Sequence, residues 1–416
     1  MLPRHPKSLV SGGNDSTYRL YLLALCALTH TFAAAMPFSC MPVLFAEMSE
    51  DLGLSLVQVG TVWGMVSLAG VFVALIGGLL GDRFGVKLVL GLACLLVGIT
   101  GALRGLSVDF ISLAATVFLC GLMRWIIPTN VHKTVGIWFR GQNLSAANGV
   151  ASMGMGIGLM LGPMVSATLL SPLLGGWRNV LFLYGGVSIL IGILWFATGR
   201  EPRQVDSVTS SSDIVPIHQA LPRLIRIKDL WLLGFTLLCR MGCVIGLVGY
   251  LPLYLRGQGW SPASADGTLV SFYAASTIAV MPLSFLSDRL GSRKVILFAA
   301  LMTAVVSLVL LPLAGSILIW TLVILTGIFM DGFMAIALTM VQETSGVGVR
   351  YSGTALGLVF TISQLGAAVS PPLGNSLASV NPGSPFIFWA ALSIVAIGIL
   401  SFASETRRGL LQKKAL

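Results

Sequence analysis

Charged residues are scarce in this chain of 416 residues: aspartate, glutamate, lysine and arginine together make up only 10% of it. A soluble domain contains about 25% of these residues, and its core needs far fewer apolar residues than the 56% found here. The scarcity of charge therefore excludes an ordinary soluble globular protein. The apolar excess indicates a bundle of helices that spans a lipid bilayer.

The signatures of enzymes and metal sites are also missing. The sequence contains no phosphate-binding Gly-Lys-Ser/Thr loop, no serine nucleophile elbow and no spaced cluster of metal ligands. Its six cysteines stand in apolar stretches without the spacing of a zinc site or a disulfide framework, so we expect free thiols. We expect a protein that is not an enzyme, binds no metal and uses neither a cofactor nor ATP.

Long apolar stretches divide the chain into twelve predicted spans, because each crossing of a bilayer needs about 20 mostly apolar residues. A polar, serine-rich stretch separates the first six spans from the last six. The predicted helices cover residues 20–45, 56–80, 87–107, 110–137, 144–171, 179–198, 230–255, 266–287, 293–313, 316–341, 351–378 and 385–403.

The basic residues give these spans an orientation, because short loops rich in lysine and arginine stay in the cytoplasm. With both termini inside, the outer loops keep only Arg104, Arg178 and Arg256 as basic residues. The net charge of +10 then reflects the excess of basic residues in the cytoplasmic loops, and no nucleic-acid partner is expected. We expect a monomeric, multi-pass protein of the inner cell membrane, surrounded by lipid.

The two halves of the chain repeat each other. Asp82 follows the second predicted helix and Asp288 follows the eighth, 206 positions later. Two further charges keep nearly this spacing, as the pairs Arg140 with Arg350 and Glu201 with Glu405. We infer a duplicated six-helix unit, with an N-terminal bundle over 1–198, a cytoplasmic linker over 199–229 and a C-terminal bundle over 230–416.

The loops after the second and eighth helices resemble a known signature. The segments 78–87 and 284–294 follow the pattern Gly-x-x-x-Asp-Arg-x-Gly-x-Lys/Arg of the major facilitator superfamily, with Ser284 in place of the first glycine of the second copy. The resemblance covers essentially the whole chain. It implies an all-α membrane fold of two pseudo-symmetric six-helix bundles, which rock around a central cavity between inward-open and outward-open states.

The resemblance also implies a role for the charges in these loops. In such transporters they pair within each half and hold the cytoplasmic gate closed in the outward-open state. In the first half Val86 stands where a basic residue is common, and the alternative is that the charges only anchor helix ends at the membrane surface. The predicted gating residues are Asp82, Arg83, Arg140, Glu201, Asp288, Arg289, Arg350 and Glu405.

Four ionisable residues fall well inside predicted spans: His30, Arg124, Arg240 and Asp331. They lie on the first, fourth, seventh and tenth helices, which line the central cavity in the family fold. An ionisable group at this depth normally faces water or a partner. Apart from Lys133 with His132, near the end of the fourth helix, we expect no comparable charge in any other span.

Two arginines cannot shed their protons inside such a cavity, and Asp331 compensates only one of them. The surplus positive charge predicts an anionic substrate, because a guanidinium group binds carboxylate, phosphate or nitrate through two parallel hydrogen bonds. Arg124 and Arg240 are the candidate substrate-binding residues, and His30 and Asp331 are the candidates for proton coupling. Structural roles remain open: an Arg124–Asp331 strut, Arg240 extending to the membrane surface, and His30 as a packing residue.

The leading hypothesis is secondary transport of a small organic or inorganic anion (a carboxylate, sugar acid, cyanate or nitrate), with proton-coupled symport favoured. The alternative is efflux of drugs or metabolites in exchange for protons. Gly158 to Pro163 partly resembles the Gly-x-x-x-Gly-Pro motif of drug antiporters, but Met164 to Ala167 lacks the glycine pair that ends it. A third hypothesis is a membrane sensor or assembly protein that retains the fold without transport.

Overall fold

The computed structural model describes residues 14–73, 80–81, 83–139, 143–200 and 217–405. Within these ranges the chain forms helices and the loops between them, without a strand. Twelve of the described helical segments are long and apolar enough to cross a membrane, which confirms the predicted number of spans.

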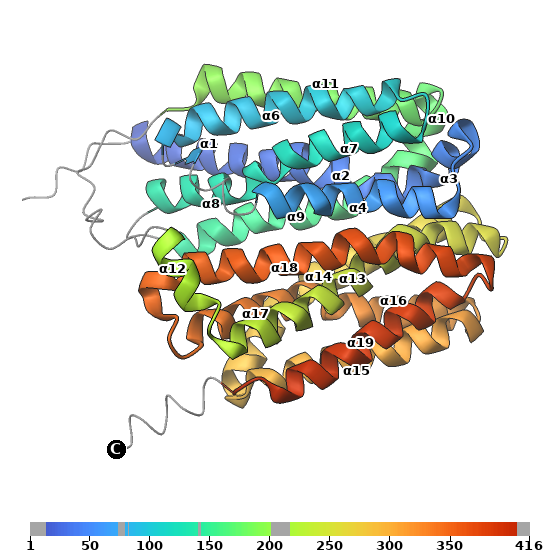
Figure 1. Ribbon diagram of the computed structural model, residues 1–416. Coiled ribbons are helices and arrows are strands. Elements are labelled where there is room, and N and C mark those ends of the chain that lie inside the picture. Colours follow the sequence, from blue (N-terminus) through green and yellow to red (C-terminus); the bar gives the residue numbers. More distant parts are fainter. Residues whose placement is uncertain (1–13, 74–79, 82, 140–142, 201–216, 406–416) are drawn as a thin grey trace, which may run out of the picture.

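The first six spans form one layer of the molecule, drawn in blue to green in the upper part of Figure 1. Several of these spans contain a short π-helical or 3-10 segment or a break. Their elements are α1 (Asn14–Leu28), η1 (Thr29–Ala35), α2 (Met36–Ser39), α3 (Met41–Leu52), α4 (Leu56–Val73), α6 (Val86–Leu103), η2 (Arg104–Leu106), α7 (Phe110–Arg124), α8 (Ile126–Trp138), α9 (Leu144–Val165), η3 (Ser166–Leu170), α10 (Ser171–Leu174) and α11 (Trp177–Thr198).

The last six spans form the second layer, drawn in yellow-green to red in the lower part of the same view. Their elements are α13 (Lys228–Gly257), α14 (Pro262–Leu290), α15 (Arg293–Leu310), η4 (Leu311–Leu313), α16 (Ser316–Ile328), α17 (Met330–Glu343), α18 (Gly348–Ser376), η5 (Leu377–Ser379) and α19 (Ser384–Phe402).

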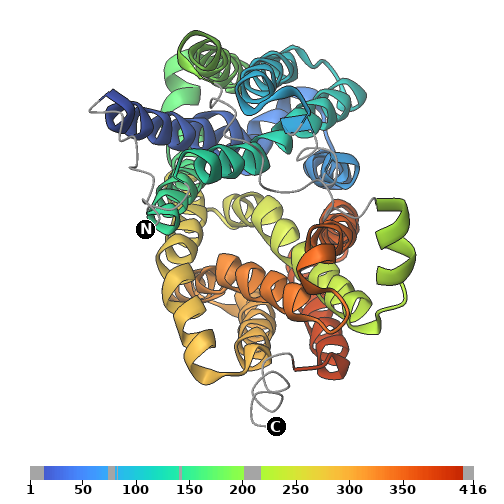
Figure 2. The ribbon, with the colours of Figure 1, turned by 90° about the vertical axis from the view of Figure 1, so that its left-hand side faces the viewer.

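Much of the predicted linker, at residues 201–216, lies outside the described residues. Its later part is not an irregular loop, because it contains a short helix, α12 (Ile217–Leu224). Ala220 and Leu224 of this helix are fully buried in the apolar core of the C-terminal half. In Figure 2 the yellow-green α12 lies on the outer side of the molecule beside α18.

The outer surface of the bundle is apolar. Large side chains such as Ile111, Ile317 and Phe402 are at least 73% exposed, and they sit on spans that carry few charges. A soluble protein rarely exposes so much apolar surface. The exposed apolar side chains therefore face lipid, and the chain is a multi-pass membrane protein.

The first turn of α1 and the last turn of α19 lie at the same end of the bundle, on the left in Figure 1. We call this end the terminal end and the other the opposite end. At the opposite end one apolar cluster includes residues of both halves, among them Trp63, Leu247 and Trp389. Toward the terminal end the core divides into two clusters, one inside each half. The two halves are therefore sealed together at the opposite end.

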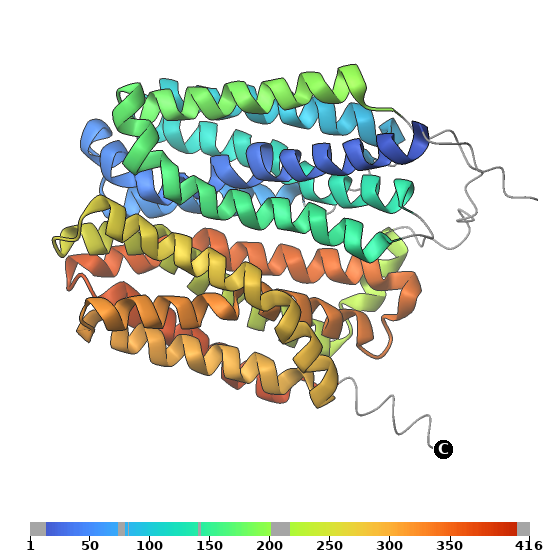
Figure 3. The same ribbon diagram turned by 180° about the vertical axis from the view of Figure 1, so that it is seen from behind.

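Close backbone packing makes this seal. α4 lies along α18 (Figure 1) and α9 crosses α14 (Figure 3). Trp63 Nε1 donates a hydrogen bond to the Ile245 carbonyl at 2.8 Å, and Asn375 Nδ2 donates one to the Leu56 carbonyl at 2.9 Å. A methyl group added at Gly64 would overlap the carbonyl oxygen of Ala368 on α18. Glycine is therefore required at this position for the two halves to close.

Candidate functional site

Three of the four central charges lie at irregular points of their helices. His30 belongs to the π-helical segment η1, Arg124 ends α7 where the fourth span breaks, and Asp331 lies in the first turn of α17 after the break in the tenth. Breaks of this kind leave backbone N–H and C=O groups free for ligands, as in other transporters. Arg240, by contrast, sits inside the continuous helix α13.

Arg240 is fully buried, and none of its three guanidinium nitrogens has a hydrogen-bond partner. None of the ion pairs among the described residues includes it. The Phe333 ring lies 5.4 Å from its guanidinium carbon. The Cys243 thiol, one helical turn further on, is a close polar neighbour of the guanidinium, but a neutral sulfur is only a weak acceptor and supplies no counter-charge. An unpaired guanidinium in an apolar interior costs several kcal/mol, so the fold leaves the charge of Arg240 uncompensated.

Arg124 is held in place by a hydrogen bond to the backbone of the first span and by two aromatic rings. Its Nε donates to the Ala34 carbonyl on η1 at 2.6 Å, and its guanidinium carbon lies 4.2 Å from the Phe38 ring centre and 5.1 Å from that of Trp125. The side chain remains 8% exposed, unlike Arg240. The strut that the sequence left open as an alternative does not form, because Arg124 makes no ion pair with Asp331.

Asp331 does not form the predicted ion pair with one of the central arginines. Its carboxylate accepts a hydrogen bond from the Ser276 hydroxyl on α14 at 2.6 Å, and no arginine lies within ion-pair distance of it. The buried Tyr273, one turn before Ser276, is close enough to interact with both Asp331 and Arg124. Asp331 is thus near the edge of the Arg124 site without neutralising that arginine.

His30 connects the centre with the terminal end. Its Nδ1 donates to the Ala151 carbonyl at 2.7 Å, because a carbonyl can only accept. Its buried Nε2 has no partner. The His132 ring lies 5.3 Å from the His30 ring, is exposed and pairs through Nδ1 with Asn148 Oδ1 at 3.0 Å. The histidine pair therefore extends from accessible surface to the interior, and sequence reasoning noted His132 without recognising this contact.

Only part of the predicted gating set can be placed. Asp82, Arg140 and Glu201 lie outside the described residues, and Arg350 lies in the first turn of α18. Arg83 and Arg289 are exposed at the terminal end, with the Arg83 guanidinium carbon 5.3 Å from the Phe84 ring.

The charges of the C-terminal half gather around Arg293, which the sequence did not single out. Arg293 forms two hydrogen bonds of 2.8 Å with the Glu343 carboxylate and lies 3.5 Å from Asp288. Glu405 accepts from the Ser292 hydroxyl at 2.7 Å and from the Arg293 backbone N–H at 3.1 Å. Asp288 and Glu405 are therefore brought to one cluster at the terminal end.

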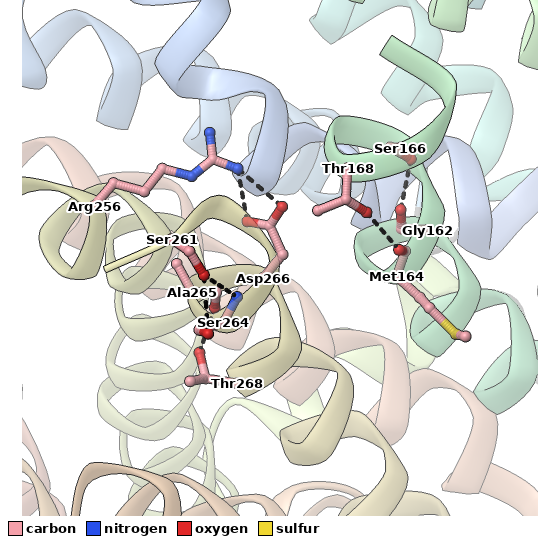
Figure 4. A network of polar contacts seen from close by, with 10 residues as sticks. All are labelled: Gly162, Met164, Ser166, Thr168, Arg256, Ser261, Ser264, Ala265, Asp266 and Thr268. Atoms are coloured by element: carbon pink, nitrogen blue, oxygen red, sulfur yellow. Dashed lines mark hydrogen bonds and ion pairs between the residues drawn. The ribbon is translucent and has the colours of Figure 1, made fainter. Parts of the chain in front are cut away.

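The structure corrects the expectation that other spans lack buried charge. Arg104 is 2% exposed and Asp266 is 1% exposed. The sequence predicted Arg104 in an outer loop and gave no role to Asp266. Arg256 Nη2 donates to both oxygens of Asp266 at 2.8 Å (Figure 4). Both residues come from the C-terminal half, so the pair ties α13 to α14. No sequence periodicity distinguishes these buried charges from loop charges.

A cavity of about 360 Å³ lies at the opposite end, between η3 and the start of α14. Met164, Thr168, Asp266 and Trp320 are among its lining residues, three of which appear in Figure 4. The hydroxyls of Ser166 and Thr168 are bonded to the carbonyls of Gly162 and Met164 within their own helix. The cavity contains none of the central charges, so it does not serve as the charged site.

Comparison with known proteins gives a consistent picture. The sequence profile of the Major Facilitator Superfamily matches residues 23–284 and 258–415. The chain is similar to a probable nitrate/nitrite antiporter of Thermus thermophilus, with 26% identity over 73% of this chain and 68% of that protein. It is also similar to the 3-(3-hydroxy-phenyl)propionate transporter of Escherichia coli, with 23% identity over 96% of this chain and 97% of that protein.

Two further similarities bear on function and fold. A multidrug resistance protein of Escherichia coli is 26% identical over 92% of this chain and 93% of that protein. Among solved structures, a bacterial homologue of the human lysosomal transporter Spinster, in an inward-facing and occupied conformation, superposes with a TM-score of 0.79 at 16% identity. That comparison covers 95% of this chain and 98% of the other.

Proposed function

Because the chain belongs to the Major Facilitator Superfamily of membrane transporters, we propose that it is a secondary transporter of a small anion, driven by proton symport. The observation that carries this proposal is Arg240, a buried guanidinium with no partner for any of its nitrogens. Arg124 adds a second positive charge, and Asp331 compensates neither of them. Relatives named for nitrate and for an aromatic carboxylate support an anionic substrate.

The proposed orientation places the terminal end in the cytoplasm of the cell, with both termini inside the inner membrane. The support is the collection of basic residues in the loops of that end. With the opposite end sealed, the structure then represents an inward-facing state. The cluster of Asp288, Arg293 and Glu343 lies within the C-terminal half and would position the loops of the terminal end for closure in the other state, and the transporter would work as a monomer.

Lysine substitutions at the two arginines test anion binding. Arg124→Lys and Arg240→Lys keep the charge but lose the paired hydrogen bonds, so the apparent affinity should fall about tenfold or more, since a charge-assisted hydrogen bond contributes about 1.5–3 kcal/mol. The measurement is uptake into proteoliposomes of labelled nitrate, aromatic carboxylates and sugar acids. Arg178→Lys is the control, because Arg178 is a partly exposed arginine at the opposite end that is already paired with Asp51. If both central arginines can become alanine without changing the uptake of any anion, the proposal is wrong.

Replacing Asp331 with asparagine tests proton coupling. Asparagine can still accept the Ser276 hydrogen bond but cannot be protonated, so uphill accumulation driven by a proton gradient should disappear. Exchange of labelled for unlabelled anion across the same liposomes should persist, because this half-reaction needs no net proton movement. Loss of exchange together with accumulation would show that Asp331 binds the substrate or supports the fold instead.

Drug efflux by proton exchange is the second candidate, favoured by the similarity to the multidrug resistance protein. It predicts the reverse order of effects. Asp331→Asn would then abolish the binding of cationic dyes, and the arginine substitutions would leave transport nearly unchanged.

A further inference from the structure

Arg104 is a buried cation outside the proposed substrate site. It lies in η2 at the end of the third span, 2% exposed. Its Nε donates to the Gly101 carbonyl at 3.1 Å and its Nη1 to the Pro37 carbonyl at 3.0 Å, while Nη2 has no partner. No ion pair among the described residues includes Arg104. Two backbone carbonyls therefore fix its position but leave its charge uncompensated.

A small void lies beside this guanidinium. Its volume is about 10 Å³, and both Arg104 and Arg124 line it. The remaining lining comes from Cys120 and from apolar residues of the first four spans, with no carboxylate among them. A void of this size holds about one particle as large as a water molecule.

The charges around the void decide what that particle is. Arg104 and Arg124 are close enough to repel each other, and repulsion between like charges is strong where the surroundings are apolar. A water molecule could bond to the free Arg104 Nη2, but it would bring no negative charge. A halide ion does both. It is larger than water, so the apolar lining must yield to admit it, and nitrate or a carboxylate, with several heavy atoms, requires a larger displacement.

We propose that the N-terminal bundle contains a binding site for a single halide ion, between Arg104 and Arg124. The ion joins the end of the third span to the fourth and, through the Arg104–Pro37 hydrogen bond, to the first. It also neutralises part of the positive charge next to Arg124. The position of the Arg124 guanidinium at the proposed substrate site would then depend on the bound ion. The proposal does not depend on which substrate is transported, because the void is too small for the transported anions considered above.

Thermal unfolding of the purified full-length protein tests this site. Sodium chloride and sodium bromide should raise the melting temperature saturably compared with sodium gluconate at equal ionic strength, because a ligand that binds only the folded state stabilises it. At about five times the dissociation constant we expect a shift of roughly 1–3 °C. Nitrate or benzoate added in excess should not displace the halide. An equal melting temperature in all salts, or displacement by benzoate, would contradict a separate halide site.

The matched variant is Arg104→Gln, whose amide nitrogen stands at the place of Nε and can still donate to the Gly101 carbonyl, but which carries no charge. It should lose the halide-dependent shift, while Arg178→Gln at the partly exposed pair with Asp51 should keep it. If Arg104→Gln does not fold, the wild-type protein still decides the matter through anomalous scattering from crystals grown in bromide. A peak between Arg104 and Arg124 supports the proposal, and its absence from that place overturns it.

Discussion

Replacing Arg240 with methionine should abolish anion transport and at the same time make the purified protein more stable. Arg240 is fully buried without any hydrogen-bond or ion-pair partner, so the folded state bears the full cost of its desolvation. Methionine is of similar length, is unbranched and fits the apolar contact with Phe333. We expect the free energy of unfolding to rise by about 3 kcal/mol, which corresponds to a melting temperature roughly 3 °C higher for a chain of this length.

The control for this prediction lies on the same helix. Arg256→Met removes an arginine that is paired with Asp266 and leaves that carboxylate buried and unpaired, so the melting temperature should fall. The opposite signs for two arginine-to-methionine changes on α13 separate a functional charge from a structural one. If Arg240→Met destabilises the protein as much as Arg256→Met does, Arg240 has a partner within the fold, and the anion proposal loses its main support.

Replacing Gly64 with alanine should stop transport by preventing closure of the opposite end. The added methyl group would overlap the backbone of α18 at Ala368, and a backbone carbonyl cannot rotate away as a side chain can. We expect turnover to fall about tenfold or more, since a misfit that costs about 1.4 kcal/mol already changes an equilibrium tenfold and overpacking costs about 1–3 kcal/mol. Gly136→Ala on α8 is the control, because nothing lies within 4 Å of the methyl group that it adds.

Thiol labelling can show which end of the transporter is open. A cysteine introduced at Val59, which is 1% exposed in the seal, should react about tenfold faster in the Gly64→Ala background than in the wild type. All six native cysteines are buried, so the background reaction is low. Asp288→Asn should act in the opposite direction, because it weakens the Arg293 cluster at the terminal end and favours the sealed opposite end. Equal labelling of Val59→Cys in all backgrounds would mean that neither Gly64 nor Asp288 controls the two states.

Several predictions from the sequence depended on local patterns, and these are confirmed. The twelve spans and the all-α fold follow from apolar stretches of sufficient length, which cannot satisfy their backbone in lipid except as helices. The membership in the superfamily follows from a loop motif that is contiguous in the chain. The roles assigned to His30, Arg124, Arg240 and Asp331 stay predictions, although the structure shows all four to be at least partly buried.

The partners of the buried charges could not be predicted in the same way. Sequence reasoning paired Asp331 with an arginine, but the structure pairs it with Ser276, 55 positions away. It treated Arg104 as a loop charge, but the Pro37 carbonyl, 67 positions earlier, fixes Arg104 in the interior. It named Asp288, Arg350 and Glu405 among the gating residues and left out Arg293, which the structure shows between Asp288 and Glu343.

The sequence by itself determined that this protein crosses a membrane twelve times, in two related halves, and that it carries more positive than negative charge in its interior. These properties depend on the composition and spacing of residues within single helices, where the lipid environment leaves few alternatives. Only the tertiary structure decided which interior charges are neutralised, because each partner comes from a different helix and depends on how the helices pack. Arg256 has a carboxylate, whereas Arg104 and Arg240 have none, and it is this difference that directs both proposals toward anions.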